Sequence, residues 1–349
     1  MMKTKPSNRR AFTLVELLVV VAIIALLIGV LLPALSSARE SGYSISCSNM
    51  QRQLAMGASS YAGSADGFYP GINSSGVGIS GAFGNASNQI ATNSKGSLPV
   101  QRWDWMTCSI DEGLPDERAK RFRQLMTKFA CPSCRETGGV YPNSSDGYSN
   151  LVQLDIKKNG LFPISSYLMP ANFQWRGALE AGATTAKSDG TVTDTNGKLL
   201  GFYYPTSFKE VTPVSFIPRT DGVKSPSSKV FCADGARYLD GPPVSAWDFD
   251  ATLEGGTFGA FTDSGPMFKS SVAYGLPNES TASNNGNAAA SSYRHKGKIN
   301  AAFFDGHIDT LTDDVSRNPK YWYPSGYKFT GTDCSQKSFN YLKAGDKIP

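Results

Sequence analysis

The sequence has few of the residues on which enzymes most often rely. Its 349 residues include only two histidines, His295 and His307. The metalloprotease pattern HExxH, the phosphate-binding P-loop pattern and the Gly-x-Ser-x-Gly nucleophile elbow do not occur. A Ser-His-Asp mechanism would need one of the two histidines, and neither lies in a suitable local context. We therefore expect a protein that is not an enzyme.

Charged residues are also scarce, at 18% of the chain. The net charge is +5, but 34 basic residues are scattered among 29 acidic ones. Lys and Arg form no stripe interleaved with aromatic residues, which is the pattern that nucleic-acid binding favours. We therefore expect no nucleic-acid partner.

The N-terminal region, in contrast, has a long hydrophobic run. Leu17 to Ala38 contains no charged residue, and together with Phe12 to Leu14 the apolar run is long enough to cross a hydrocarbon layer of ~30 Å. Basic residues precede it at positions 3, 5, 9 and 10, so the N-terminus should stay in the cytoplasm and the rest of the chain should be exported. A secretory signal peptide cleaved near the "ALSSA" stretch is the alternative.

One acidic residue, Glu16, lies near the start of this run. An ionisable group inside a membrane is costly and needs a partner. Cleavage between Ala11 and Phe12 would create such a partner, because the new α-amino group of Phe12 would lie one helical turn from Glu16. The amine and the carboxylate, within one helix or between neighbouring helices, would neutralise each other and set the register between subunits.

The stretch "RRAFTLVELLVVVAIIALLIGVLLPAL" resembles the class III signal of type IV prepilins and type II secretion pseudopilins. The resemblance implies that prepilin peptidase cuts after Ala11 and methylates the amine of Phe12, and that Glu16 guides assembly. Pro33 matches the helix-kinking proline of many pilins. Ala11 departs from the pattern, in which Gly usually precedes the cut. The alternative is a plain signal anchor with an incidental Glu.

The resemblance also implies an α+β fold in which a long N-terminal helix packs on an antiparallel β-rich globular body with long loops. We expect a leader at 1–11, a helix at 12–62 that spans the membrane at 12–33, and an exported body at 63–349. In the second half of the helix, the spacing of apolar and small residues predicts one buried stripe. That stripe consists of Ile45, Met50, Leu54, Ala58 and Tyr61.

The whole chain has 35 glycines. Gly/Ser/Asn-rich stretches of the body at 71–99, 181–197 and 279–292 are typical of surface loops. Short segments bounded by turn residues have the composition of strands. They are "GLFPISSYLMP", "LGFYYP", "KVFCAD" and "KINAAFFDGHIDTLT".

Two further motifs resemble a bacterial pseudopilin-like subfamily. The first is a Cys-Asn-x-x-Gln region with a Tyr-to-Pro segment, here Cys47, Asn49, Gln53, Tyr61, Asp66, Gly67 and Pro70. The second is the H-X9-DG signature near the C-terminus, here His295, Asp305 and Gly306.

Asp305-Gly306 between β-forming residues predicts a two-residue type I′ hairpin turn. That turn would pair Phe303 with Ile308 and Ala301 with Thr310, and it would place Ala302 and Phe304 on the opposite face. We expect His295 to anchor the start of the strand by a hydrogen bond. A metal or ligand site that also included Asp305, His307 and Asp309 would need residues about 30 Å apart along the strand.

The six cysteines are candidates for up to three disulfides in an exported chain. They are Cys47, Cys108, Cys131, Cys134, Cys232 and Cys334. The "CPSC" segment at 131–134 offers two zinc ligands, but no second cysteine pair follows, so disulfides are favoured and no metal is assigned. Cys47 lies on the predicted helix, and a bond from it to a cysteine of the body, with Cys131 one candidate, would fix the helix to the sheet.

We predict no cofactor, although the Asp-rich stretch "DGTVTDTNGK" at 189–198 leaves calcium open as an alternative. Our interpretation is an exported pilin-like subunit whose partners are prepilin peptidase, other pilin-like subunits, the inner membrane and the secretion or pilus machinery. Its body would be periplasmic or on the cell surface. One alternative is a membrane-tethered protein that binds a glycan or another surface ligand. Another is an exported hydrolase that depends on His295.

Overall fold

The computed structural model describes residues 13–71, 74, 99–100, 103–110, 112–134, 137–138, 154–177, 191–193, 199–202, 216–239, 246–247, 261–276, 279 and 287–349. The predicted cut between Ala11 and Phe12 lies outside these residues. So do most of the predicted calcium loop at 189–198 and most of the three predicted surface loops.

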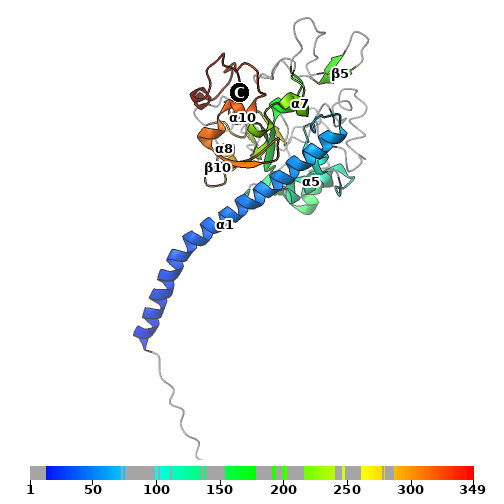
Figure 1. Ribbon diagram of the computed structural model, residues 1–349. Helices are drawn as coiled ribbons and strands as arrows, with labels where there is room; N and C mark the ends of the chain where they lie inside the picture. The colour runs from blue at the N-terminus through cyan, green and yellow to red at the C-terminus, as the bar shows by residue number, and fades with distance from the viewer. Residues whose placement is uncertain are drawn as a thin grey trace, which may run out of the picture.

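Helix α1 (Leu14–Ser64) is one continuous helix of 51 residues, and Figure 1 shows its first half extending away from the body. Thr13 is its N-cap and forms a capping box with Glu16, which fixes where the helix begins. The helix passes through Pro33, whose missing N–H leaves the carbonyl four residues earlier, that of Gly29, without its usual donor.

The part of α1 before Leu35 extends away from the body (Figure 1). The large apolar side chains from Leu14 to Leu35 are between 45% and 79% exposed. Among the described residues, α1 is the helix that is long and apolar enough to cross a membrane, judged by length and composition. Such a surface is stable only against lipid or against other apolar helices.

The body is built around a five-stranded sheet with strand order β11-β10-β6-β3-β9. Its strands are β3 (Tyr167–Pro170), β6 (Val230–Asp234), β9 (Thr262–Asp263), β10 (Lys298–Phe303) and β11 (Ile308–Thr312). Neighbouring strands from β11 to β3 pair antiparallel, whereas β3 and β9 pair parallel. The fold class is therefore α+β as predicted, but the sheet is mixed and not wholly antiparallel. The stretches predicted as strands each contain one or two strands.

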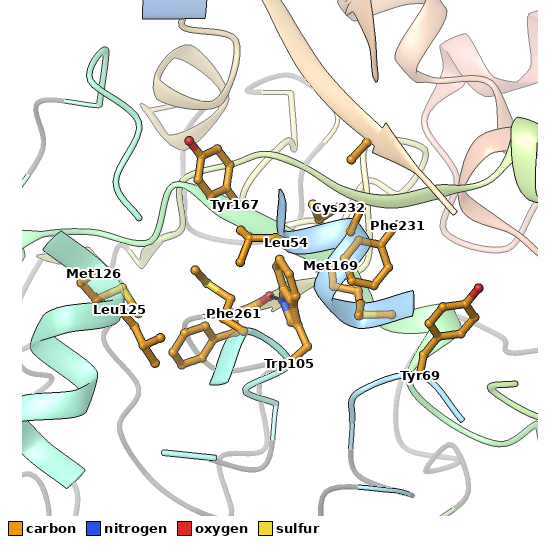
Figure 2. Packing of buried hydrophobic residues seen from close by; sticks show 14 of the residues in the cluster. Leu54, Tyr69, Trp105, Leu125, Met126, Tyr167, Met169, Phe231, Cys232 and Phe261 are labelled. Atoms are coloured by element: carbon orange, nitrogen blue, oxygen red, sulfur yellow. Dashed lines mark hydrogen bonds between the residues drawn. The ribbon is translucent and has the colours of Figure 1, made fainter. Parts of the chain in front are cut away.

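The sheet separates two clusters of buried side chains. On one face, α1 and α4 (Met106–Ile110) pack against the strands, and Figure 2 shows Leu54 of α1 among Trp105, Met169 and Phe231. On the other face, Ile299, Ala301 and Phe303 of β10 pack against C-terminal residues such as Trp322. The alternation of side chains along β10 is what a strand buried on both faces requires.

The other elements of the described residues are short and surround this core. They are α5 (Arg118–Lys128), α7 (Thr220–Val223), α8 (Asn287–Ser292), α9 (Asp313–Ser316), α10 (Pro319–Trp322), the 3₁₀ helices η1 (Ala171–Phe173), η2 (Pro226–Ser228) and η3 (Gln336–Asn340), and the pairs β1 (Thr137–Gly138) with β2 (Phe162–Pro163), β4 (Thr191–Thr193) with β5 (Leu199–Phe202), and β7 (Tyr238–Leu239) with β8 (Ala246–Trp247).

The buried stripe of α1 differs in part from the predicted one. Leu54 and Ala58 are buried as expected, but Ile45 is 63% exposed. The buried side chains are Cys47, Gln51, Leu54, Ala55, Ala58 and Ala62. The prediction for Ile45 was wrong because small and polar residues occupy the face where the helix approaches the sheet and α4 closely. Hydrophobicity alone does not mark that face.

The hairpin between β10 and β11 also differs from the prediction. Ala302 pairs with Ile308 and Ala301 with Asp309, one residue out of the predicted register. The Phe303 N–H donates to the His307 carbonyl, so the loop has three residues and only its last, Gly306, has positive φ, at 86°. A single left-handed glycine suffices for this loop, whereas a type I′ turn would need two such residues. The predicted faces hold for β10, with Ala301 and Phe303 in one cluster and Ala302 and Phe304 in the other. They were wrong beyond the loop, because the one-residue shift places Ile308 with Ala302 and stacks His307 on Phe303.

The close approach of α1 to α4 generates a test of this packing. A Cβ atom at Gly57 would lie 1.9 Å from the carbonyl oxygen of Ser109 in α4, and a backbone atom cannot rotate away. We expect Gly57→Ala to lower the free energy of unfolding by about 1–3 kcal/mol, measured by denaturant unfolding of the full chain in detergent. Gly63→Ala is the matched control, because a Cβ at Gly63 meets nothing within 4 Å. Equal stability of the two variants would contradict the packing.

Candidate functional site

The main candidate site is the helix–body junction, where residues 37–51 of α1 contact the body. Three segments of the body meet the helix there: the "CPSC" turn at 131–134, the end of β6 at Asp234, and the residues 294–300 that lead into β10. These segments lie far apart in sequence, so the junction is a product of the fold.

A disulfide joins Cys47 of α1 to Cys131 of the body, with the two Cα atoms 5.2 Å apart. Both cysteines are fully buried. Cys131 lies in a turn in which the Cys134 N–H donates to its carbonyl, and its own N–H donates to the Ser166 hydroxyl. The helix is thus covalently attached to the body, at the cysteine pair that the sequence offered as one candidate.

The other four cysteines, Cys108, Cys134, Cys232 and Cys334, are buried thiols. The six cysteines, all in the described part of the chain, thus form one disulfide, which is within the predicted maximum of three, and the other four form none. The physical reason is their distribution, since Cys108 lies on α4, Cys232 on β6, and Cys334 in the cluster on the other face of the sheet. Burial, together with the nearby Asp234 carboxylate, raises the pKa of the Cys232 thiol, so this thiol stays protonated and unreactive.

His295 lies inside the junction and is only 4% exposed. Its Nδ1 is 2.8 Å from Oε1 of Glu40 on α1, and its Nε2 is 3.3 Å from Oδ2 of Asp234 and 3.5 Å from Sγ of Cys131. Because an ionised carboxylate only accepts hydrogen bonds, Nδ1 is the protonated donor to Glu40. His295 therefore connects the helix to the body, which goes beyond the predicted role of anchoring the start of a strand.

The Asp234 carboxylate accepts hydrogen bonds from three residues of the junction. Its Oδ1 accepts from Nε2 of Gln51 and from Nη2 of Arg294, both at 2.9 Å. Its Oδ2 accepts from the N–H of Asn300 at 2.8 Å. Burial lowers the pKa of Arg294, but the charge of Asp234 together with the nearby Cys134, Tyr167 and Tyr274 outweighs burial and holds that pKa above its ordinary value. Arg294 and Asp234 therefore form a buried ion pair.

Further hydrogen bonds extend the junction along α1. Asn300 donates from Nδ2 to the carbonyl and the hydroxyl of Ser44. Ser133 donates to the same Glu40 oxygen that contacts His295, at 2.8 Å. Lys296 donates to the hydroxyls of Ser37 and Ser41 near the point where the helix leaves the body. These bonds fix the rotation of the helix about its own axis as well as its position.

The remaining residues of the predicted C-terminal motif lie at the other end of β10. The Asp305 carboxylate accepts from the N–H of His307 and contacts its Nδ1 at 2.6 Å, and both side chains are partly exposed. His307 stacks on Phe303. Asp305 and Gly306 thus shape the hairpin loop, and they are not brought together with His295.

The N-terminal motif forms a second, separate group. The Glu16 carboxylate accepts from the N–H and from the hydroxyl of Thr13, both at 2.9 Å, and the Thr13 hydroxyl accepts from the Glu16 N–H. Glu16 therefore closes the first turn of α1 in addition to any role between subunits. Asp66 and Gly67 of the predicted Tyr-to-Pro segment form the turn after α1, both with positive φ, and Arg219 lies 3.5 Å from the Asp66 carboxylate.

Sequence reasoning missed several residues of the junction. Glu40, Gln51, Asp234, Arg294 and Asn300 were not singled out, and Gln53 was chosen where the buried residue is Gln51. One signal was available for Gln51, because it lies four residues after Cys47 and so shares its helix face. The others have no local pattern, since each finds its partner through the tertiary fold.

The disulfide generates a second prediction. Its closed loop, with a sequence separation of 84, should contribute about 4–5 kcal/mol to the free energy of unfolding through the entropy of the unfolded chain. We expect the double variant Cys47→Ser/Cys131→Ser to lose this contribution to the free energy of unfolding. Adding a phosphine reductant should then leave its stability unchanged. Both results would be measured by denaturant unfolding with a chelator present. Cys134→Ser, in the same turn, should remain sensitive to reductant. A double variant as stable as the oxidised wild type would refute the assignment.

Comparison with known proteins bears on the N-terminal group. Residues 6–32 match the family model described as "Prokaryotic N-terminal methylation motif". No curated protein and no solved structure matches the chain. The match covers Arg9 and Arg10 of the leader, Glu16 and the apolar run as far as Leu32, which includes the start of α1. The chain therefore carries a type IV prepilin-like signal, and this signal with the apolar helix fits a single-pass membrane anchor.

Proposed function

We propose that this chain is a structural pilin- or pseudopilin-like subunit that is cut by prepilin peptidase and assembles at the cell envelope. One observation carries the proposal. The first half of α1 presents an uncovered apolar surface from Leu14 to Leu35, while the second half of the same helix is fixed to the body. A helix of this kind is held in lipid before assembly and packs against the same helix of other subunits afterwards.

The N-terminal match supports processing between Ala11 and Phe12. Cleavage there leaves Thr13 as the second residue of the mature chain, so its N–H and hydroxyl can still donate to Glu16. The new amine of Phe12 adds a positive charge within one helical turn of the Glu16 carboxylate. The amine and carboxylate of adjacent subunits then set the stagger between their helices, because an unpaired charge in lipid is costly.

The helix–body junction supports a role in which the helix carries the body. Cys47–Cys131 and the hydrogen bonds of Glu40, Ser44 and Gln51 attach the helix near the point where it leaves the body. Movement of the helix during assembly would therefore move the body with it. We place the body outside the cytoplasm, since disulfides persist in oxidising compartments and the basic leader favours a cytoplasmic N-terminus.

The contacts of His295 support a role that is not enzymatic. Both ring nitrogens of this residue already have partners, and the side chain is buried under α1. His307 is held by Asp305 at a hairpin loop. Neither histidine is hydrogen-bonded to a serine or threonine hydroxyl in the described residues, which supports the proposal of a structural role.

The experiment is mass spectrometry of the N-terminal peptide of membrane-extracted protein, together with separation of filament from monomer by shearing and sedimentation. We expect the wild type to begin at N-methylated Phe12 and to appear in the sheared fraction. Glu16→Ala should also be cut but should be depleted from that fraction, because the stagger is lost. Glu16→Gln is the matched control that keeps the size and hydrogen bonding of the side chain and removes its charge.

Other outcomes would contradict parts of the proposal. A chain that begins at Met1, or within the "ALSSA" stretch, would refute processing by prepilin peptidase. A correctly processed wild type that stays monomeric in the membrane would refute assembly, and would leave a tethered protein that binds a glycan or another surface ligand.

A further inference from the structure

The helix–body junction contains a set of atoms with the composition of a zinc site. Sγ of Cys47, Sγ of Cys131, a carboxylate oxygen of Asp234 and a ring nitrogen of His295 all lie within 4.8 Å of one another, and all four residues are buried. They come from α1, the "CPSC" turn, β6 and the approach to β10. Zinc was set aside on the sequence because no second cysteine pair follows, but here the other two candidate ligands are a histidine and an aspartate.

The distances between these atoms fit tetrahedral zinc at two edges. Ligand bonds of about 2.3 Å to sulfur and 2.0–2.1 Å to nitrogen or oxygen place a sulfur and a nitrogen about 3.6 Å apart, and a nitrogen and an oxygen about 3.3 Å apart. The structure has 3.5 Å between Cys131 Sγ and His295 Nε2, and 3.3 Å between His295 Nε2 and Asp234 Oδ2. The edge that must change most is the sulfur–sulfur edge, because the disulfide has to be reduced before the two sulfurs can lie about 3.8 Å apart on one zinc ion.

The groups around these atoms are those that orient zinc ligands. Glu40 accepts from Nδ1 of His295 at 2.8 Å, which leaves Nε2 to face the two sulfurs and Asp234. A carboxylate on the far nitrogen is the usual support of a zinc-bound histidine. Asp234 is oriented by Gln51, Arg294 and the Asn300 N–H. The ligands are therefore held in place by hydrogen bonds to protein groups.

Charge also favours a metal ion at this place. Two thiolates and the Asp234 carboxylate carry three negative charges, and Zn²⁺ with the Arg294 guanidinium carries three positive ones, so the buried group is neutral. In addition, Nε2 of His295 faces a carboxylate oxygen at 3.3 Å, which is longer than a normal charge-assisted hydrogen bond. A cation bound between the His295 nitrogen and the Asp234 oxygen would accept a lone pair from each of them.

We propose that the chain, before its disulfide forms, binds Zn²⁺ through Cys47, Cys131, Asp234 and His295. Zinc displaces one proton from each thiol as it binds. Oxidation then removes two electrons from the two thiolates, forms the sulfur–sulfur bond and releases Zn²⁺. The electrons pass to a thiol-disulfide oxidant, whose own disulfide takes up two protons and becomes a dithiol. This inference does not depend on the proposed function.

The consequence is that α1 is fixed to the body in both redox states. Zinc holds Cys47 and Cys131 together in the reduced chain, and the disulfide holds them together after oxidation. Zinc also keeps the two sulfurs adjacent, so that the later bond forms between this pair and not with the neighbouring Cys134.

The test uses the full chain in detergent, reduced with a phosphine, stripped with a chelator and then given Zn²⁺ or Co²⁺ alone. After removal of excess metal, we expect the reduced wild type to retain about one equivalent of zinc. With Co²⁺ it should show the thiolate charge-transfer and intense visible bands of a tetrahedral site. The oxidised wild type, which is folded and unmutated, should retain none and show neither band.

Four variants test the site, two of them at proposed ligands. Cys47→Ser and Cys131→Ser should each lose the thiolate charge-transfer intensity and retention of zinc. Cys134→Ser should keep both, because this thiol is not part of the ligand set. Glu40→Gln should keep the stoichiometry while weakening affinity about tenfold or more, since it removes the charge that supports His295.

Several results would overturn the proposal. These are a reduced wild type that retains no zinc, zinc retained equally by the oxidised chain, or zinc retained by Cys47→Ser but lost from Cys134→Ser. The last result would place the metal at the "CPSC" turn alone. Because the oxidised wild type needs no mutation, misfolding of a variant cannot hide the answer.

Discussion

The buried carboxylate of Asp234 is the group on which the join between helix and sheet depends. It lies at the end of β6 and receives hydrogen bonds from α1, through Gln51, and from the segment that leads into β10. A buried carboxylate is tolerated only when its lone pairs are occupied and its charge is compensated. Arg294 supplies the compensating positive charge. Asp234 on the sheet is therefore satisfied only when both the helix and the 294–300 segment are in place.

This constraint explains why one helix has two different halves. Up to Leu35 its apolar side chains have no partner within the described chain, and from Ser37 onward polar and small residues replace them and meet the body. The change occurs over a single turn. A membrane segment and a globular domain are thus joined without a flexible hinge, since the helix is continuous from Leu14 to Ser64.

Sequence reasoning was most accurate where the chain carries a local pattern. The prepilin-like signal, the long helix and the strands around Cys232 and Ala302 all follow from runs of residues close in sequence. At the helix–body junction it offered the Cys47–Cys131 pair as one candidate but missed Glu40 and Asp234, because these residues acquire their roles only when distant segments meet. The predicted length of the hairpin loop was wrong by one residue. Asp-Gly is compatible with loops of two or three residues, and only packing of the strands decides between them.

The bond between Cys47 and Cys131 also closes a covalent ring that contains α1 from Cys47 to Ser64, the turn at Asp66 and the whole of α4 and α5. Cleavage of any one peptide bond inside this ring opens the loop but leaves a single covalent molecule. A protease acting on the surface between these cysteines would therefore nick the protein without detaching its membrane helix from its body. Complete release would need a second cut outside the ring or reduction of a disulfide that is shielded from solvent.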